Sequence, residues 1–365
     1  MKLVEFVPPT PHPLWKLCPQ MGITDVIVKV NPDLTGLPDP WKFETLASIV
    51  GHLKSAGLTV VGLEGDPFDM TPIKEFGERG MGNGEREEAL AHYRELLESM
   101  GRLGIKLLCY NFMVGKGWSR TGVREGRGGA KATYFSLKEM TSDFGRQTSS
   151  AEVRSPKSEV LNLTSEQVWA NYEYFIKAVM PTAEKWGIRM GLHPDDPCLG
   201  SLGGYARIFG SIEAYDRAYG IYQSPSNAVT FCQANFKLMF TSDNCHNCSQ
   251  ITNTSSTCST RLNAPTEALA DAARHFGKRI AFIHIRDVEG DKTDFTELFH
   301  DQGDVDQFAL MRTYREIGLD VPVRGDHVPE MAYDRALTPE GTPGYFTLGR
   351  LFANGYLKAL LKGTK

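Results

Sequence analysis

Short apolar runs rich in β-branched residues alternate along this chain with longer segments whose apolar positions recur at the helical period. The runs are predicted strands at residues 3–6, 25–30, 59–63, 106–110, 189–192, 228–231, 280–285 and 321–324. The longer segments are predicted helices at residues 41–55, 86–103, 165–186, 212–222, 265–276, 305–317 and 345–362. Such alternation implies a parallel sheet, and eight units predict a closed (β/α)8 TIM barrel of the α/β class. The alternative is an open doubly wound sheet, but no GxGxxG motif follows the first strand to support it.

Two long segments interrupt this alternation, and each follows a predicted strand. Residues 111–160 are rich in Gly, Arg and Ser, and residues 241–262 are polar and almost free of aliphatic side chains. The loops after the strands of such a barrel lie at its C-terminal face, where active sites are built. We therefore expect one barrel domain over residues 1–365, with long loops at the C-terminal face. The first segment is a candidate lid over the mouth.

The bulk composition is that of an ordinary globular protein and narrows the range of partners. The 365 residues are 41% hydrophobic and 23% charged, with a formal net charge of −4. This balance gives no electrostatic footprint for nucleic acid or an anionic membrane, so we expect neither partner. No apolar stretch is long enough to span a membrane, and the N-terminus does not resemble a secretory signal. We expect a cytoplasmic location.

Four consecutive predicted strands each end in a side chain that can bind a metal. His193 follows the fifth strand, Cys232 the sixth, His284 lies in the seventh, and Asp326 follows the eighth. Strand ends are neighbours around the mouth of a barrel, so these side chains can converge. Two imidazoles, one thiolate and one carboxylate suit a divalent metal. One such residue alone is as often a buried, hydrogen-bonded side chain, but four equivalent placements favour a metal site.

Several segments of the sequence carry a family resemblance. They are CYNFM (109–113) with Trp118, Arg120 and Thr121, the segment NYEYFIKAVMPTAEKWGIRMGLHPDDP (171–197), SPSNAVTFC (224–232), IHIRDV (283–288), GDVD (303–306), DH (326–327) and PGY (343–345). On these residues the chain resembles mannonate dehydratase of the UxuA type, within the xylose isomerase-like barrels. The resemblance runs from about residue 45 to the C-terminus, and its LHPDDP segment is highly specific.

The resemblance implies a divalent metal, commonly manganese, on the four residues at the strand ends. Ligand chemistry alone leaves iron, cobalt and zinc as alternatives, because a thiolate favours softer ions and the other ligands suit harder ones. The resemblance also implies that His327 and Tyr345 catalyse the loss of water from D-mannonate to give 2-keto-3-deoxy-D-gluconate. A base must take the proton from C2 and an acid must protonate the departing 3-hydroxyl. His327 suits proton transfer near neutral pH, but the sequence does not decide which residue is acid and which is base.

Four further residues are candidates for binding the substrate. Arg120 and Arg286 offer guanidinium forks for a carboxylate or hydroxyls, although an ordinary ion pair explains either one equally well. Asn111 ends the fourth strand and can bind a hydroxyl. Asp195 can contact the substrate or, with Asp196, orient His193. Both aspartates can also be capping residues in a turn.

The sequence departs from the family pattern at three places near the expected site. The usual Arg-Trp-aromatic-Gly run of the first strand is replaced by VEFVPP (4–9). An acidic residue is missing where Gly117 precedes Trp118, and the usual Asp-His-Gly ending continues here as Val328-Pro329. These changes are compatible with the same chemistry on a related aldonate, or with a divergent mannonate dehydratase.

The segment 241–262 contains Cys245, Cys248 and Cys258, and the first two have CxxC spacing. Such spacing is compatible with zinc, but a second CxxC is missing. We favour an exposed insertion at a subunit interface, in a homo-oligomer, over a second metal site.

Two other functions compete with a hydro-lyase acting on a small-molecule sugar acid. One is a metal-dependent sugar isomerase or epimerase on the same barrel, against which the Cys232 ligand speaks because such sites are usually rich in carboxylates. The other is a sugar-acid binding protein without activity. The paired acid and base, His327 and Tyr345, speak against it because binding alone requires neither.

Overall fold

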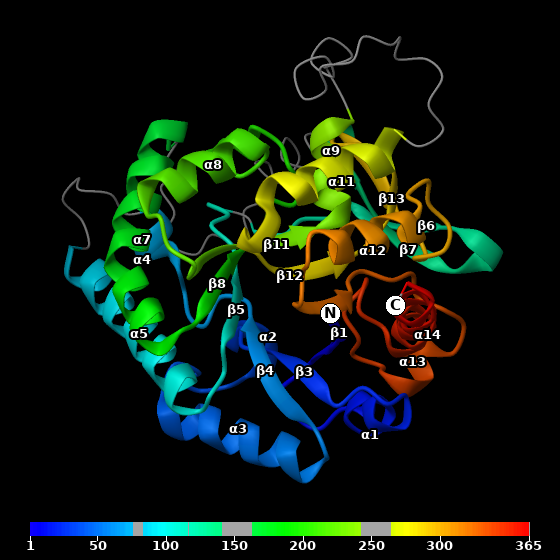
Figure 1. The fold of residues 1–365 in the computed structure, drawn as a ribbon, viewed down its shortest axis with the longest axis horizontal. Helices are drawn as coiled ribbons and strands as arrows, with labels where there is room; N and C mark the ends of the chain where they lie inside the picture. The colour runs from blue at the N-terminus through cyan, green and yellow to red at the C-terminus, as the bar shows by residue number, and fades with distance from the viewer. Residues whose placement is uncertain (76–82, 116, 141–162, 242–263, 365) are drawn as a thin grey trace, which may run out of the picture.

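A parallel sheet closed into a barrel forms the centre of the molecule in the computed structural model, which describes residues 1–75, 83–115, 117–140, 163–241 and 264–364 (Figure 1). In spatial order its strands are β1 (Lys2–Leu3), β15 (Pro322–Gly325), β12 (Ile280–Ile285), β11 (Asn227–Cys232), β8 (Arg189–Leu192), β5 (Leu107–Tyr110), β4 (Thr59–Glu64), β3 (Asp25–Lys29) and β2 (Glu5–Val7). Only Val4 separates β1 from β2. Because β1 pairs with β15 and β2 pairs with β3, this first strand closes the ring. The predicted eight-stranded barrel is confirmed, and the open doubly wound sheet is wrong.

Helices surround the barrel on its outer side (Figure 1). The longer ones are α1 (Pro13–Gln20), α3 (Phe43–Ser55), α5 (Asn83–Arg102), α7 (Ser165–Trp186), α8 (Ile212–Ile221), α9 (Gln233–Phe240), α11 (Ala264–Phe276), α12 (Gln307–Glu316) and α14 (Thr347–Gly363), and the short ones are α2 (Pro32–Thr35), α4 (Thr71–Lys74), α13 (Asp334–Leu337), η1 (Arg127–Gly129) and η2 (Gly277–Arg279). Every predicted helix is present. In α7, Thr164 and Gln167 form a capping box and Gly187 ends the helix in a left-handed conformation, so its termini follow from local sequence.

The apolar core has two layers, one on each side of the barrel wall. The outer layer packs strand residues such as Val26 and Val28 against the helices. The inner layer fills the barrel with side chains that include Phe6, Ile27 and Phe282. Successive strand residues alternate between these two sides, and this alternation decides which residues face the mouth.

A small antiparallel sheet stands beside the mouth of the barrel. Its order is β13 (Val288–Asp291), β14 (Asp294–Glu297), β7 (Lys131–Ser136) and β6 (Gly122–Glu125), and a separate two-stranded ribbon joins β9 (Ser201–Leu202) and β10 (Tyr205–Ala206). The sequence pattern did not predict this sheet, because β6 and β7 lie in the segment 111–160, whose composition resembles that of a loop. Part of that segment is therefore a β-hairpin, whereas residues 141–162 lie outside the described residues.

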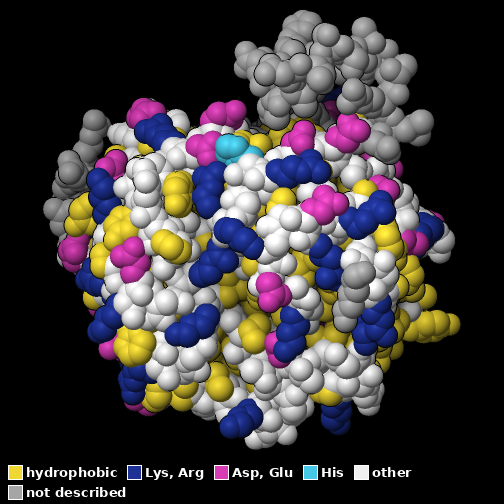
Figure 2. All heavy atoms as spheres, in the orientation of Figure 1, with side chains coloured by type: hydrophobic (Ala, Val, Ile, Leu, Met, Phe, Trp, Pro, Cys, Tyr) yellow, Lys and Arg dark blue, Asp and Glu magenta, His cyan; other side chains and the backbone are white. Residues whose placement is uncertain are grey.

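The other segment, 241–262, also lies almost entirely outside the described residues, and with it Cys245, Cys248 and Cys258. The cysteines within the described ranges are Cys18, Cys109, Cys198 and Cys232, all buried and free. In the described part of the chain, no helix has the length and apolarity needed to cross a membrane. The face shown in Figure 2 intersperses basic and acidic side chains, in agreement with the small net charge.

One buried ion pair ties the first strand to the last helix. Glu5 of β2 accepts hydrogen bonds from Arg350 and Asn354 of α14 and from the backbone of Phe6. Glu5, Arg350 and Asn354 are all buried. The two ends of the chain are thus joined at the seam where the barrel closes.

Replacing Glu5 with alanine should destabilise the fold strongly, because Arg350 would stay buried without its partner. We expect a loss of about 3–5 kcal/mol in the free energy of unfolding, measured by urea denaturation followed by circular dichroism. The matched control is Glu173→Ala, which removes the exposed ion pair with Lys177 and should cost at most about 0.5 kcal/mol. Equal effects of the two substitutions would contradict the role given to Glu5.

Candidate active site and metal centre

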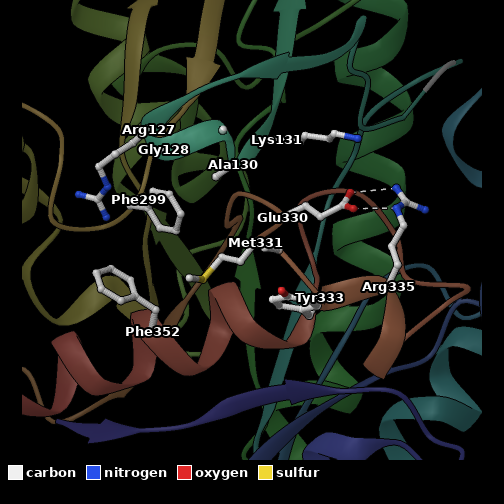
Figure 3. A pocket seen from close by; sticks show the side chains of 12 residues that line it. Arg127, Gly128, Ala130, Lys131, Phe299, Glu330, Met331, Tyr333, Arg335 and Phe352 are labelled. Carbon is white, nitrogen blue, oxygen red and sulfur yellow. Dashed lines mark hydrogen bonds and ion pairs between the residues drawn. The ribbon is translucent and has the colours of Figure 1, made fainter.

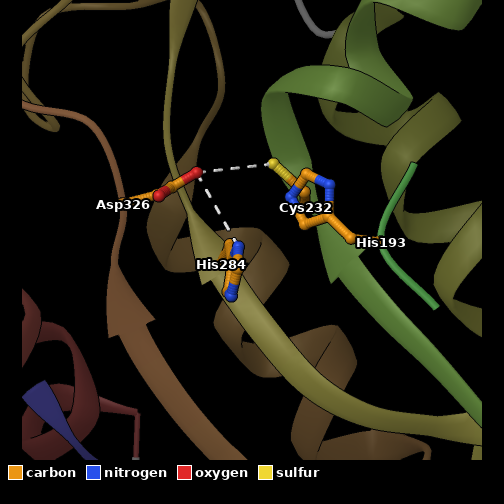
Figure 4. A group of neighbouring side chains, drawn as sticks. All are labelled: His193, Cys232, His284 and Asp326. Atoms are coloured by element: carbon orange, nitrogen blue, oxygen red, sulfur yellow. Dashed lines mark hydrogen bonds and ion pairs between the residues drawn. The ribbon is translucent and has the colours of Figure 1, made fainter. Parts of the chain in front are cut away.

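The four residues at the strand ends converge on one point at the barrel mouth. His193 and Asp326 directly follow β8 and β15, while Cys232 and His284 lie in β11 and β12, and these four strands are neighbours in the sheet. One possible ligand atom from each residue lies within 4.8 Å of the others. Figure 4 shows the four side chains directed toward one another from their strands. We call them the metal group.

The hydrogen bonding of this group fits a divalent cation. Both ring nitrogens of His284 are buried and have no hydrogen-bond partner among the described residues, an arrangement that is costly without a ligand. The Oδ2 atom of Asp326 lies 3.7 Å from His284 Nδ1 and 3.8 Å from Cys232 Sγ. Nitrogen, sulfur and oxygen donors around one point suit a transition metal, so the donor set and the unpartnered imidazole agree.

The charge states of the group depend on burial and on neighbouring cations. Burial raises the pKa of the Cys232 thiol to about 12, although Arg286 opposes the rise, so a bound cation is needed to favour the thiolate. Burial also acts to raise the pKa of Asp326, but His327 and Arg324 outweigh it and hold that pKa well below its usual value.

The orientation of His193 comes from a backbone group and not from an aspartate. Its Nδ1 lies 2.8 Å from the carbonyl oxygen of Pro194, which can only accept, so Nδ1 carries the proton and Nε2 is left for a ligand. Asp195 instead accepts a hydrogen bond from the backbone of Phe209 at 2.8 Å. Asp196 binds arginines. The expectation that these aspartates orient His193 is therefore wrong.

His327 and Tyr345 form a hydrogen-bonded pair next to the metal group. The Nε2 atom of His327 lies 2.9 Å from the Tyr345 hydroxyl, and that hydroxyl lies 3.4 Å from Asp326 Oδ1. On the other side of the ring, His327 Nδ1 lies 3.0 Å from Glu297 Oε1. Burial raises the pKa of Tyr345 well above its usual value, and Asp326 adds to the rise. The two residues predicted to transfer protons thus lie together.

Both candidate arginines belong to a buried ion-pair network. Arg120 donates to Asp196 at 2.7 and 3.0 Å and to Glu297 at 2.7 Å. Arg286 donates to Asp196 at 2.8 Å, to Glu297 at 2.7 and 2.8 Å, and to Asn235 at 2.7 Å. The network holds Glu297 against His327. Both guanidinium groups therefore bind protein carboxylates, and substrate binding by them stays a prediction.

Asn111 likewise makes contacts within the protein. Its Oδ1 accepts from Lys74 Nζ at 3.0 Å and from the backbone of Met113 at 3.1 Å. Neither Asn111 nor Asp195 belongs to the metal group. Substrate contacts by these two residues stay predictions.

Among the described residues, the charged side chains of the mouth that the sequence did not predict include Glu297, Glu64 and Arg324. Glu297 ends β14, in the unpredicted small sheet, so nothing in the barrel pattern pointed to it. Glu64 ends β4 and Arg324 lies in β15; Arg324 donates to Glu64 at 2.7 Å and to Asp326 at 2.9 Å. Glu64 Oε2 also lies 3.6 Å from His284 Nε2. The strand-end rule that found the metal ligands would have found Glu64 too.

Most of the chain is similar to proteins of one known family. The family model for D-mannonate dehydratase (UxuA) matches residues 16–254 and 244–365. The chain belongs to this family. The mannonate dehydratase of Streptococcus equi subsp. zooepidemicus is 26% identical over 340 residues, which are 88% of this chain and 84% of that protein. This confirms the predicted family and hydro-lyase class.

Solved structures support the fold of this mannonate dehydratase family member. The crystal structure of mannonate dehydratase from Streptococcus suis serotype 2 superposes with a TM-score of 0.76 at 24% identity, covering 100% of this chain and 93% of that one. A xylose isomerase domain protein from Planctomyces limnophilus superposes with a TM-score of 0.51 at 14% identity, covering 99% and 95%. At these identities the likeness concerns the fold alone, and it confirms the predicted barrel.

A hollow on the surface of this dehydratase family member lies apart from the metal group. Its lining includes Arg127, Phe299, Tyr333 and Phe352 (Figure 3). The carboxylate at its edge, Glu330, is bonded to Arg335 at 2.7 and 2.9 Å. No member of the metal group contributes to the lining, so we place the chemistry at the barrel mouth.

The network around Glu297 should make the stability of the protein fall in acid. Burial acts to raise the pKa of Glu297, but Arg286, His327 and Arg120 outweigh it and lower that pKa to about 2. A carboxylate with a depressed pKa stabilises the fold above its unfolded pKa of about 4.3, and this stabilisation is lost as the pH falls toward 2. Glu297→Gln should therefore be less stable at pH 7, by about 3 kcal/mol, with a shallower decline below pH 4.5.

Urea unfolding at a series of pH values measures this dependence. Glu289→Gln, at an exposed position of β13, is the control and should keep the wild-type profile. An acid decline in Glu297→Gln as steep as that of the wild type would argue against the assignment.

Proposed function

We propose that this protein removes water from D-mannonate and releases 2-keto-3-deoxy-D-gluconate. The observation that carries the proposal is the hydrogen-bonded pair of His327 and Tyr345, 2.9 Å apart, beside the metal group. An elimination needs a base and an acid at neighbouring substrate atoms, and this pair offers both. Relatives named mannonate dehydratase, which align with most of the chain, support mannonate as the substrate.

The metal group would hold a divalent cation, and we propose manganese because the family resemblance implies it. When bound, such a cation stabilises the negative charge that develops on the sugar acid as the C2 proton leaves.

His327 is the proposed base. The Glu297 carboxylate, which can only accept, lies 3.0 Å from Nδ1 of His327 and is closer to it than the Arg120 guanidinium at 3.3 Å. Nδ1 therefore carries the proton, and Nε2 keeps a lone pair that faces the Tyr345 hydroxyl at 2.9 Å and can take the proton from C2 when the substrate is bound. Glu297 also stabilises the imidazolium that this transfer creates, as a carboxylate does for other catalytic histidines. Arg120 and Arg286 fix Glu297 and so act as positioning residues.

Tyr345 is the proposed acid. Its raised pKa keeps the phenol protonated at neutral pH, so the hydroxyl can give its proton to the departing 3-hydroxyl group. The electrons of the broken C2–H bond form the C2–C3 double bond as the C3–O bond breaks and water leaves. The resulting enol becomes the 2-keto product when C3 takes up the enol proton. His327 then returns a proton to Tyr345 across their hydrogen bond.

Three further expectations belong to this proposal and stay predictions. They are a homo-oligomeric assembly, a cytoplasmic location and one domain that includes both long loops. A sugar isomerase on the same barrel is the competing function, and the product distinguishes it.

Replacing His327 with asparagine should abolish most turnover while leaving the metal in place. We expect kcat to fall by about 10²–10⁴-fold, the usual contribution of a general acid or base. The assay incubates metal-reconstituted protein with D-mannonate and detects the 2-keto-3-deoxy product chemically. The control is His52→Asn on the exposed face of α3, which should keep full activity.

The products of the wild-type protein decide between the functions. An isomerised sugar without a keto-deoxy product would favour the isomerase. Binding of mannonate without turnover, under any of the four metals, would overturn the enzymatic proposal.

Replacing Cys232 with serine should weaken metal binding, because a hydroxyl is a far poorer ligand than a thiolate. We expect metal affinity to fall by at least about 10-fold, measured by metal content after dialysis against a chelator. The stabilising shift in the melting temperature on adding metal should shrink accordingly. Cys18→Ser, which changes a buried thiol outside the metal group, is the control. Undiminished metal retention by Cys232→Ser would remove this residue from the ligand set.

A further inference from the structure

A lysine on the opposite side of the mouth has no partner in the mechanism described above. Lys29 is the last residue of β3. Within the described parts of the chain, its ammonium group forms no hydrogen bond and no ion pair. Its side chain is half-buried, and its Nζ atom keeps some exposure to solvent.

The register of the sheet shows that Lys29 faces the inside of the barrel. Ile27, two residues earlier, belongs to the inner apolar layer, and Val28 belongs to the outer one. Because side chains alternate along a strand, Lys29 shares the side of Ile27. Its partner in the neighbouring strand is Glu64, whose carboxylate also faces inward and binds Arg324 at 2.7 Å.

The acidic side chain nearest to Lys29 does not neutralise its ammonium charge. Its nearest acidic neighbour along the strand register, Glu64, is already paired with Arg324. Burial lowers the pKa of Lys29, Glu64 opposes this, and Arg350 adds to the decrease. A half-buried cation that is held without a close counter-charge is costly, and an oxygen-rich ligand in the mouth would offset that cost.

The position of Lys29 relative to the metal group indicates which part of a ligand it meets. In the closed order of strands, β3 lies four strands from β11, the strand of Cys232, in either direction. A sugar acid whose carboxylate end lies at the metal group can extend across the mouth toward β3 with its other end. We infer that Lys29 is a substrate-binding residue that donates hydrogen bonds to the oxygen atoms at the distal end, C5–C6, of the sugar acid.

This inference rests on the proposed function. It predicts that the site distinguishes sugar acids by the length of their carbon chain. A cation at the distal end favours sugar acids long enough to bring hydroxyl or other acceptor oxygens to it. It makes no contribution to the proton transfers at C2 and C3, which occur beside His327 and Tyr345.

The test combines Lys29→Met with substrates of two lengths. For D-mannonate we expect KM to rise by about 10-fold or more, as for the loss of a hydrogen bond to a charged group, with kcat changed less than about threefold. For the four-carbon sugar acid that has the configuration of D-mannonate at C2 and C3, we expect Lys29→Met and the wild type to have equal KM values. Lys54→Met, at an exposed position of α3, is the matched control and should match the wild type with both acids.

A binding measurement separates this inference from the proposed function. In the His327→Asn background with metal bound, calorimetry should show Lys29→Met weakening the affinity for D-mannonate about 10-fold and leaving metal affinity unchanged. Lys29→Gln serves the same comparison if the methionine variant does not fold. Weakened binding without wild-type turnover would sink only the proposed function. Unchanged binding, equal losses for both acids, or lost metal affinity would overturn the role of Lys29.

Discussion

The charges buried at the barrel mouth must neutralise one another, because an unpaired ion in such surroundings costs several kcal/mol. Two networks meet this constraint. In one, Arg120 and Arg286 bridge Asp196 and Glu297. In the other, Arg324 bridges Glu64 and Asp326.

The consequence of this pairing is preorganisation of the reactive groups. Two guanidinium groups hold the Glu297 carboxylate in place, and this carboxylate in turn orients the His327 ring. Nδ1 of His327 then carries the proton that faces Glu297, and Nε2 faces the Tyr345 hydroxyl. In the second network, His327 and Arg324 together hold the pKa of Asp326 well below its usual value. Arg324 binds Oδ1 of this carboxylate, and Oδ2 lies 3.7 Å from His284. The proton-transfer pair and the metal group are therefore held in place by the same balance of charges.

Much of this arrangement follows from patterns in the sequence. Buried parallel strands are short apolar runs, and in a barrel their ends must lie around one mouth, so the positions of His193, Cys232, His284 and Asp326 along the chain are enough to group them. Glu297 could not be grouped in this way, because its strand belongs to the small sheet, and its partner Arg120 lies 177 residues away in sequence. Pairings at such separation depend on tertiary packing and have no local signature. The group that orients His193 was left open for a related reason: whether the backbone carbonyl of Pro194 or a carboxylate does so depends on turn geometry, which residue types alone do not specify.

The departures from the family pattern leave the reactive side of the mouth intact. Phe6, in the altered first strand, packs 5.8 Å from the Tyr345 ring and lies under Arg324, while its neighbour Glu5 turns outward to α14. Val328, which follows His327, bonds through its backbone to Gly344 at 2.9 Å and so keeps the chain beside Tyr345. The altered first strand and the altered segment after His327 therefore both pack beside the catalytic pair without displacing it. The strands β8, β11, β12 and β15 are constrained by the metal group and by paired charges, whereas the Lys29 ammonium at the inward end of β3 has no ion-pair partner in the described part of the chain. Selection for a different sugar acid can therefore act on the β3 side without disturbing the groups that break the C–H and C–O bonds.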